Sequence, residues 1–296
     1  MLLVAAALTS CTKPSDHGYL SVGIDYSVNG NPLITDSLCY HNEAGNAFMI
    51  TEIQWFISKI ELQNEQGDWY LLEHRDVDDP ASTNKVFYID TNIPESQTLT
   101  MSALPIGRYK ALRFTFGLDE AGNQTGLFSN PPEANMFWPD PLGGGYHYMK
   151  LNGKYVTADG ELAPLNIHLG IGQNADHSEY YQNYFTVEGP IDLYVHGNKE
   201  NFITLRMDVD NWFRNPHVYD FNVYGSAIMQ NQDAQQTLKE NGQDVFTWSV
   251  FDGHLEKDMN KEEIVEGFSR IMRQAAPQPH FWKWDNVKER VKKLRV

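Results

Sequence analysis

Residues 48–62 constrain the fold of this chain more than any other stretch. They read F-M-I-T-E-I-Q-W-F-I-S-K-I-E-L, a long run rich in aromatic and β-branched side chains. With the two-residue period of a strand, Ile53 and Trp55 fall on one face, and Ile50 and Phe56 fall on the other. A strand with two apolar faces has to be covered on both sides, so the pattern predicts a central strand of a β domain.

Other segments show similar strand patterns. Strands are predicted over residues 19–28, 108–118, 146–151, 165–169, 202–209 and 245–251. A helix is predicted over residues 228–242, because Asn241 followed by Gly242 is a typical helix stop. Residue 119 opens a long loop that reaches residue 135, and long loops on a rigid β scaffold often carry functional sites. The 296 residues suffice for one large all-β domain or two smaller domains, and the strands favour the all-β class.

The first eleven residues indicate export. Residues 1–10 read M-L-L-V-A-A-A-L-T-S and precede Cys11, as in a bacterial lipoprotein signal peptide. In that pattern the cysteine is lipidated and becomes the first residue of the mature protein. The apolar run is too short to span a bilayer as a helix. We therefore predict a signal peptide over residues 1–11, lipidation at Cys11, a polar tether over residues 12–17, and membrane attachment through the lipid.

The net charge and the number of cysteines limit the possible partners and the possible covalent cross-links of this chain. The formal net charge is −16, and the main body has no basic stripe. Nucleic acid is excluded as a partner, because its phosphates are repelled by such a surface. After Cys11 only Cys39 remains, so there is no intramolecular disulfide framework. Cys39 is either a buried, inert thiol or a metal ligand together with His41, which would face the same side of a strand.

One segment, residues 135–173, brings together several side chains that can bind metal. They are Met136, Trp138, His147 and His168. A turn rich in Gly and Asp joins the strands predicted at 146–151 and 165–169, so we expect a hairpin with His168 on its polar face. Imidazole and thioether groups are copper ligands, and thioether favours Cu(I). The alternative is that the aromatic and thioether side chains only fill the core beside glycine turns.

Catalysis is not expected from this sequence. It shows no nucleophile–base pair, no paired acids at a cleft and no phosphate-binding loop. A different class of function is a surface-exposed β-sandwich module that binds a protein or a glycan without metal. Its contact residues would be Trp212, Tyr180 and Tyr181. A hydrolase on a β-sandwich is a third reading, and it lacks a motif.

The character of the chain changes beyond residue 252. Residues 258–273 repeat apolar side chains at helical spacing, and a basic helix is predicted after Pro279. We therefore expect residues 253–296 to form a C-terminal helical extension.

Several segments, taken in order, resemble the MbnP-like family, which is related to MopE and CorA. They are W-F-I-S-K-I-E-L, G-R-Y-K-A-L-R-F-T-F-G-L-D-E, M-F-W-P-D-P-L-G-G-G-Y-H-Y-M-K-L-N-G, N-I-H-L-G, I-T-L-R-M-D-V-D-N-W-F and S-A-I-M…L-K-E-N-G-Q-D-V-F. The likeness covers residues 18–252. It implies an antiparallel β-sandwich-like domain with Greek-key connections over that range, and copper binding. With the lipoprotein start, it implies a Bacteroidetes-type envelope protein on the periplasmic or outer-surface face of the outer membrane.

The resemblance also implies a site. Characterised members use His ligands and a Trp that a di-haem peroxidase-like partner oxidises to kynurenine. Trp138 matches the first Trp of the pattern Met-x-Trp-x-Trp-x-x-Gly-Tyr, and Met136 matches its Met. The second Trp is Asp140 here. His168 matches the His of the His-Leu-Gly element.

The second imidazole remains open between His147 and His41. Each ligand imidazole is expected to give its other ring nitrogen to a fixed partner. Asn166, Asp119 and a backbone carbonyl are the candidates for that role.

Overall fold

The computed structural model describes residues 16–74, 85–101, 103–174, 176, 178–197 and 199–256, with side chains up to residue 251. The predicted signal peptide, the lipidated Cys11, most of the tether and the helical extension beyond residue 256 lie outside the described residues. These predictions therefore stay predictions.

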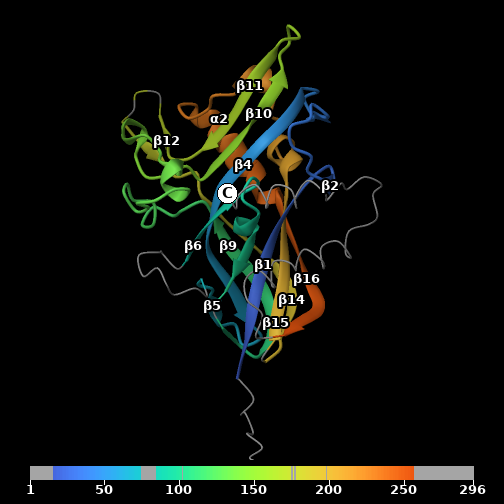
Figure 1. Cartoon of the computed structure of the whole chain (residues 1–296). Coiled ribbons are helices and arrows are strands. Elements are labelled where there is room, and N and C mark those ends of the chain that lie inside the picture. Colours follow the sequence, from blue (N-terminus) through green and yellow to red (C-terminus); the bar gives the residue numbers. More distant parts are fainter. Residues whose placement is uncertain are drawn as a thin grey trace, which may run out of the picture. The chain divides into compact units, whose positions relative to one another are not determined.

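One sheet has six strands (Figure 1). They are β1 (His17–Val28), β2 (Asn31–Pro32), β7 (Thr98–Thr100), β8 (Leu104–Pro105), β15 (Lys199–Asp208) and β16 (Phe246–Glu256). The main order is β16-β15-β1-β2, and β7 and β8 also pair with β1. β1 and β15 run parallel, from Tyr19 opposite Glu200 to Ser27 opposite Asp208, whereas the other paired strands in the described part of the chain are antiparallel.

The second sheet has eight strands. They are β3 (Tyr40–His41), β4 (Ala47–Asn64), β5 (Trp69–Leu71), β6 (Val86–Asp90), β9 (Gly107–Phe116), β10 (Met149–Val156), β11 (Leu162–Leu169) and β14 (Phe185–Val195). The main order is β11-β10-β4-β9-β14, so β4 lies at the centre as its apolar faces predict. A separate ribbon pairs β12 (Gly172–Gln173) with β13 (Tyr180–Tyr181).

The helices of the described residues are short. They are η1 (Pro94–Gln97), η2 (Glu133–Met136), η3 (Asp140–Leu142), η4 (Val209–Phe213), η5 (Gly242–Asp244), α1 (Phe221–Tyr224) and α2 (Gln232–Asn241). The predicted helix ends where expected but begins later, because the Asn231 side chain caps it by accepting from the Ala234 amide. Within the described ranges, every helix is too short or too polar to cross a membrane.

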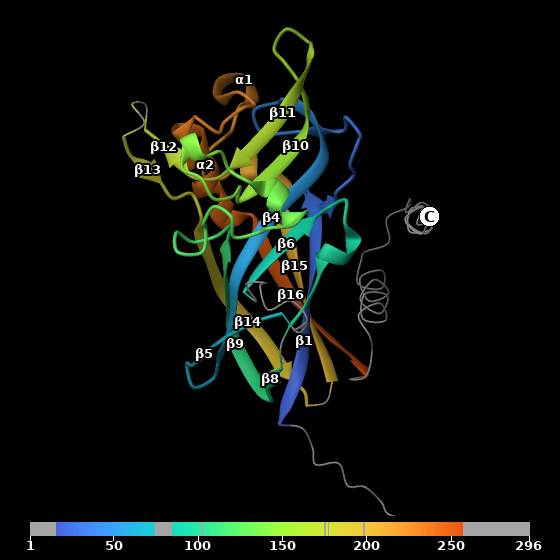
Figure 2. The same cartoon turned by 60° about the vertical axis from the view of Figure 1, so that its left-hand side comes forward.

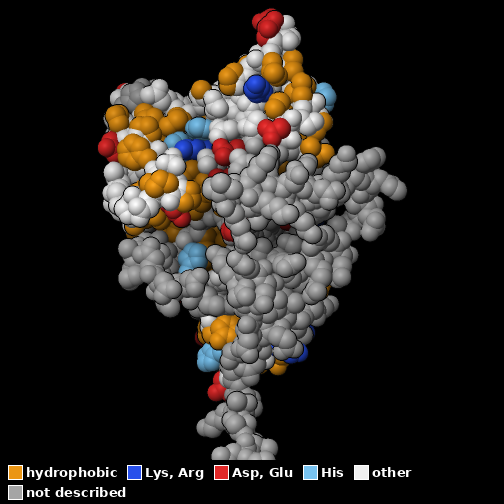
Figure 3. Space-filling model, in the orientation of Figure 1, with side chains coloured by type: hydrophobic (Ala, Val, Ile, Leu, Met, Phe, Trp, Pro, Cys, Tyr) orange, Lys and Arg blue, Asp and Glu red, His pale blue; other side chains and the backbone are white. Residues whose placement is uncertain are grey.

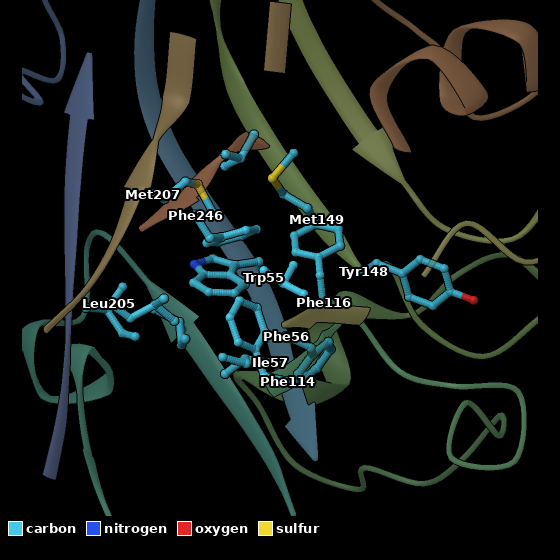
Figure 4. Packing of buried hydrophobic residues seen from close by; sticks show 14 of the residues in the cluster. Trp55, Phe56, Ile57, Phe114, Phe116, Tyr148, Met149, Leu205, Met207 and Phe246 are labelled. Carbon is cyan, nitrogen blue, oxygen red and sulfur yellow. The ribbon is translucent and has the colours of Figure 1, made fainter. Parts of the chain in front are cut away.

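The core explains why β4 is apolar on both faces. Trp55 points toward the six-stranded sheet, where its ring centroid lies 5.4 Å from that of Phe246 and its indole N–H donates to the Tyr26 hydroxyl at 3.0 Å (Figure 4). Phe56 points the other way and stacks on Phe128, 5.3 Å away between centroids. The six-stranded sheet thus covers one face of β4, and the long loop after β9 covers the other.

That loop leads into the hairpin of β10 and β11, which the sequence also predicts. Figure 2 shows β10 and β11 side by side, with α2 and β12 to one side of them. The register pairs Met149 with Leu169 and Lys150 with His168. The Tyr148 amide donates to the Leu169 carbonyl at 2.7 Å, so the ladder extends back toward His147. The hairpin therefore brings the loop end close to His168.

Candidate metal centre

The loop around Trp138 closes on itself by backbone pairing. The Trp138 amide donates to the Gly145 carbonyl at 2.8 Å, and the His147 amide donates to the Met136 carbonyl at 2.6 Å. The turn between them contains Gly145 at φ +77°, where an L side chain is strained, and an added Cβ would also meet Asn123. The glycine turn thus folds the chain back and sets Trp138 beside His147.

Three rings then follow one another in space. The Trp138 and His147 ring centroids are 4.6 Å apart, with an interplanar angle of 74°. The His147 and His168 centroids are 5.1 Å apart, with an angle of 83°. Trp138 is fully buried, and its indole N–H donates to the Leu142 carbonyl at 3.0 Å. Of the residues predicted from the sequence, Trp138, His147 and His168 therefore converge.

The His147 ring has one nitrogen held and one free. Nδ1 lies 2.9 Å from the Met136 carbonyl oxygen. Because a carbonyl only accepts, Nδ1 carries the proton and Nε2 carries the lone pair. Nε2 is buried and has no hydrogen-bond partner among the described residues. A buried acceptor without a hydrogen-bond partner costs free energy of folding. This acceptor is the lone pair of a neutral imidazole whose other nitrogen is hydrogen-bonded, which is the state in which a histidine binds a metal ion.

The His168 ring is oriented by a chain of polar groups. Its Nε2 lies 2.9 Å from Asn152 Oδ1, and Asn152 Nδ2 donates to Glu52 Oε2 at 3.3 Å. Because a carboxylate only accepts, the Asn152 amide must turn its NH2 group toward Glu52 and its oxygen toward His168. His168 Nε2 therefore carries the proton and donates to that oxygen, and His168 Nδ1 keeps its lone pair. The other Glu52 oxygen accepts from Asn92 Nδ2 at 2.9 Å. This is the arrangement by which outer groups orient a metal-binding histidine.

Both imidazoles stay neutral at pH values well below the usual pKa of a histidine side chain. Burial, reinforced by the positive charge of Lys150, lowers the pKa of His147 to about 3. The same two causes, with burial again the larger, lower the pKa of His168 to about 4. Protons therefore compete little for the two lone pairs near neutral pH.

Met136 contributes in a different way from the prediction. Its side chain is fully buried, and its backbone carbonyl accepts from both the amide and Nδ1 of His147. Met136 thus orients His147 through its backbone. Nothing in the contacts of the described residues assigns its thioether a ligand role.

The structure separates His41 from this cluster. His41 is exposed on β3 opposite Ala47, and Phe48 pairs with Tyr155. Tyr155 lies six residues along β10 from Met149, which corresponds to about 20 Å at the rise of a strand. The second imidazole beside His168 is therefore His147.

Several supporting predictions are corrected. Asp119 forms an ion pair with Lys59 and does not contact a site histidine, and the side-chain partner of His168 is Asn152, one strand away from Asn166. Cys39 is exposed, not buried. Trp212 is fully buried and therefore offers no surface to a partner.

The donor set is small. Over the described residues, no group of three or more His, Cys, Asp or Glu side chains could hold a metal ion. Two imidazoles beside an indole are what the structure places together. Structural zinc sites take four N, S or O donors, whereas a soft ion at low coordination needs fewer, so the donor set fits Cu(I) better than Zn²⁺.

The fold and the site together define a β-sandwich protein in which a buried histidine and a half-buried histidine lie beside a tryptophan. The chain belongs to the MbnP family, whose model matches residues 17–250. Membership makes it a protein of a copper-related, methanobactin-associated family. The structure is similar to that of MbnP from Methylosinus trichosporium, with a TM-score of 0.52 and 14% sequence identity, over 79% of this chain and 99% of that chain. No curated protein sequence matches this chain.

Proposed function

We propose that this protein binds copper through His147 and His168 and performs no catalytic turnover. The observation that carries the proposal is the buried His147 Nε2, which has no partner among the described residues and lies on a ring 5.1 Å from that of His168. Neutral imidazoles are good copper ligands, and here both are oriented by outer hydrogen bonds. Copper would bind two imidazole nitrogens without having to displace a proton from either of them near neutral pH.

Trp138 is the proposed third element of the site. An unmodified indole N–H only donates, and here it is already used by the Leu142 carbonyl. Oxidation of the ring to kynurenine, with dioxygen or peroxide as the oxidant and a di-haem peroxidase-like partner as the catalyst, would cleave the indole C2–C3 bond, release C2 as formate by hydrolysis, and leave an amine and a carbonyl next to His147. We propose this modification from the family resemblance and the ring contact. Mass spectrometry of the tryptic peptide that contains residue 138, after co-expression with such a partner, tests it, and an unaltered Trp138 would contradict it.

The proposed location is the cell envelope, with the protein tethered through lipidated Cys11. The lipoprotein-like start of the sequence supports this proposal. Metabolic labelling with a fatty acid, lost in Cys11→Ser, is the expected result.

The copper proposal is tested by metal analysis of protein purified from copper-supplemented cells. We expect about one copper ion per chain, and a loss of affinity of at least about tenfold in His147→Gln and in His168→Gln. His217→Gln is the matched control, because His217 is an exposed histidine that contacts Glu240. Wild-type protein without copper, or equal copper in all variants, would rule the proposal out.

A second candidate function is binding of a protein or glycan without metal. Hydrophobic side chains gather on the side of the molecule that carries β12 (Figure 3). Tyr180 and Tyr181 of β13, which pairs with β12, are exposed, and so is Phe137. Exposed aromatic side chains are typical of interaction sites. Under this candidate function, His147→Gln should bind the protein or glycan as tightly as the wild type does. A partner whose binding depends on copper should instead no longer bind to His147→Gln.

A further inference from the structure

Lys150 is a charged side chain that the fold places against the histidine pair. It lies opposite His168 in the β10–β11 ladder. Its Nζ donates to the Asn135 carbonyl at 2.6 Å, one residue before the Met136 carbonyl that holds His147. The ammonium is thereby tied to the same short backbone segment that orients His147. One fixed cation thus accompanies both imidazoles.

The surroundings leave this charge incompletely compensated. Among the described residues, no carboxylate lies within ion-pairing distance of Lys150. Glu52 keeps its negative charge and acts on Lys150 electrostatically, but it forms no ion pair with Lys150, and its two oxygens accept from Asn92 and Asn152. Lys150 also acts on both rings, since its charge contributes to the lowered pKa of His147 and of His168. Its field therefore reaches the place where a bound metal would sit.

We propose that Lys150 is a specificity-determining residue that makes the histidine pair favour singly charged Cu(I) over doubly charged Cu(II) and Zn²⁺. The inference rests on the proposed copper function and deepens it. Repulsion between an ammonium and a metal ion is proportional to the charge of the ion, so a divalent ion suffers twice the penalty of a monovalent one.

The expected size of the effect follows from the distance scale. At an effective dielectric constant of about 20, one extra unit of charge within about 10 Å of the ammonium changes affinity by roughly tenfold or more. Removing the charge should therefore shift the ratio of Cu(I) to Cu(II) affinity toward Cu(II) by at least about tenfold. For a one-electron couple, tenfold equals a fall of about 59 mV in the reduction potential of the bound copper.

The test measures Cu(I) and Cu(II) affinities by competition with chromophoric chelators, each specific for one oxidation state. Lys150→Gln removes the charge and keeps a hydrogen-bond donor for the Asn135 carbonyl, and Lys150→Met removes both. Lys150→Arg retains the charge. Lys154→Met is the matched control, because Lys154 is an exposed lysine four residues further along the same strand. Circular dichroism establishes that each variant is folded.

We expect the affinity ratio to shift toward Cu(II) in Lys150→Gln and Lys150→Met, and to stay near the wild-type value in Lys150→Arg and Lys154→Met. Zn²⁺ affinity should rise with Cu(II) affinity. A wild-type protein that binds copper, with an unchanged ratio in both neutral variants, would overturn the role of Lys150 and leave the copper function intact. An equal shift in Lys154→Met would overturn it too, because the effect would then be one of overall charge. A wild-type protein that binds neither oxidation state would overturn both proposals.

Discussion

Acidification of the metal-free protein should lower its free energy of unfolding by several kcal/mol through two residues, His147 and His168. The pKa values of these residues in the folded state, about 3 and about 4, lie below the value of 6.5 for a free histidine. The unfolded chain therefore takes up protons first as pH falls. The stabilising contribution is fully present above pH 6.5 and is lost as pH falls toward the folded-state pKa values.

The magnitude follows from about 1.36 kcal/mol for each pKa unit. Between pH 6.5 and pH 4, the loss amounts to as much as about 3 kcal/mol for each histidine. A typical domain is stable by only about 5–15 kcal/mol, so the loss is a large share of the total. The physical cause is burial: a charged imidazolium cannot enter this site without losing its water.

Urea unfolding at a series of pH values measures this effect. The wild type is compared with the double variant His147→Gln, His168→Gln, in which the other titrating groups are unchanged. We expect the two stability curves to converge or cross as pH falls, because only the wild type carries the histidine contribution. Parallel curves from pH 7 to pH 4 would show that the histidines titrate normally and are not buried as neutral rings.

Gly170→Ala should destabilise the protein by up to about 3 kcal/mol and disturb the candidate metal centre. A Cβ at this position would lie 2.5–2.7 Å from three carbons of the Trp138 ring, closer than real Cβ contacts allow. The indole has little freedom to move, because it is fully buried and donates to the Leu142 carbonyl. The Gly170 amide is also held, since it donates to Gln235 Oε1 at 3.0 Å. The substitution therefore has to displace either the ring or the β11 end.

A double-mutant cycle identifies the cause of this loss. In a Trp138→Phe background the smaller ring leaves room for the methyl group, so Gly170→Ala should cost at least about 1 kcal/mol less than in the wild type. Urea unfolding gives the four stabilities. The same cost in both backgrounds would mean that the clash is not with the indole. Copper affinity of Gly170→Ala should fall with stability, because Trp138 contacts His147.

Much of the site could be predicted from residue types and short spacings. The glycine turn places Trp138 beside His147 by local backbone pairing, and the hairpin of β10 and β11 follows from alternation and turn residues. The groups that orient His168 could not be predicted this way. Asn152 lies on β10 and Glu52 lies on β4. The two side chains meet only because the register of β10 on β4 places them opposite each other. A one-residue shift would turn either side chain to the opposite face.

Other outcomes depended on contacts between distant parts of the chain. His41 is a histidine in a strand pattern just as His168 is, yet β3 pairs with the far end of β4. Trp212 lies in a polar-looking segment but is buried against Phe116 and Phe185. The parallel pairing of β1 with β15 joins segments about 180 residues apart, which no local pattern encodes.

The sequence by itself determined that β4 is a central strand, that the chain is β-rich, and that a tryptophan and two histidines lie near one hairpin. Those features follow from periodicity and turn chemistry, which act over a few residues. Only the tertiary structure decided which histidine joins His168, which nitrogen of each ring keeps its lone pair, and that Lys150 accompanies them. These depend on strand register and burial, and both are set by how the whole domain packs.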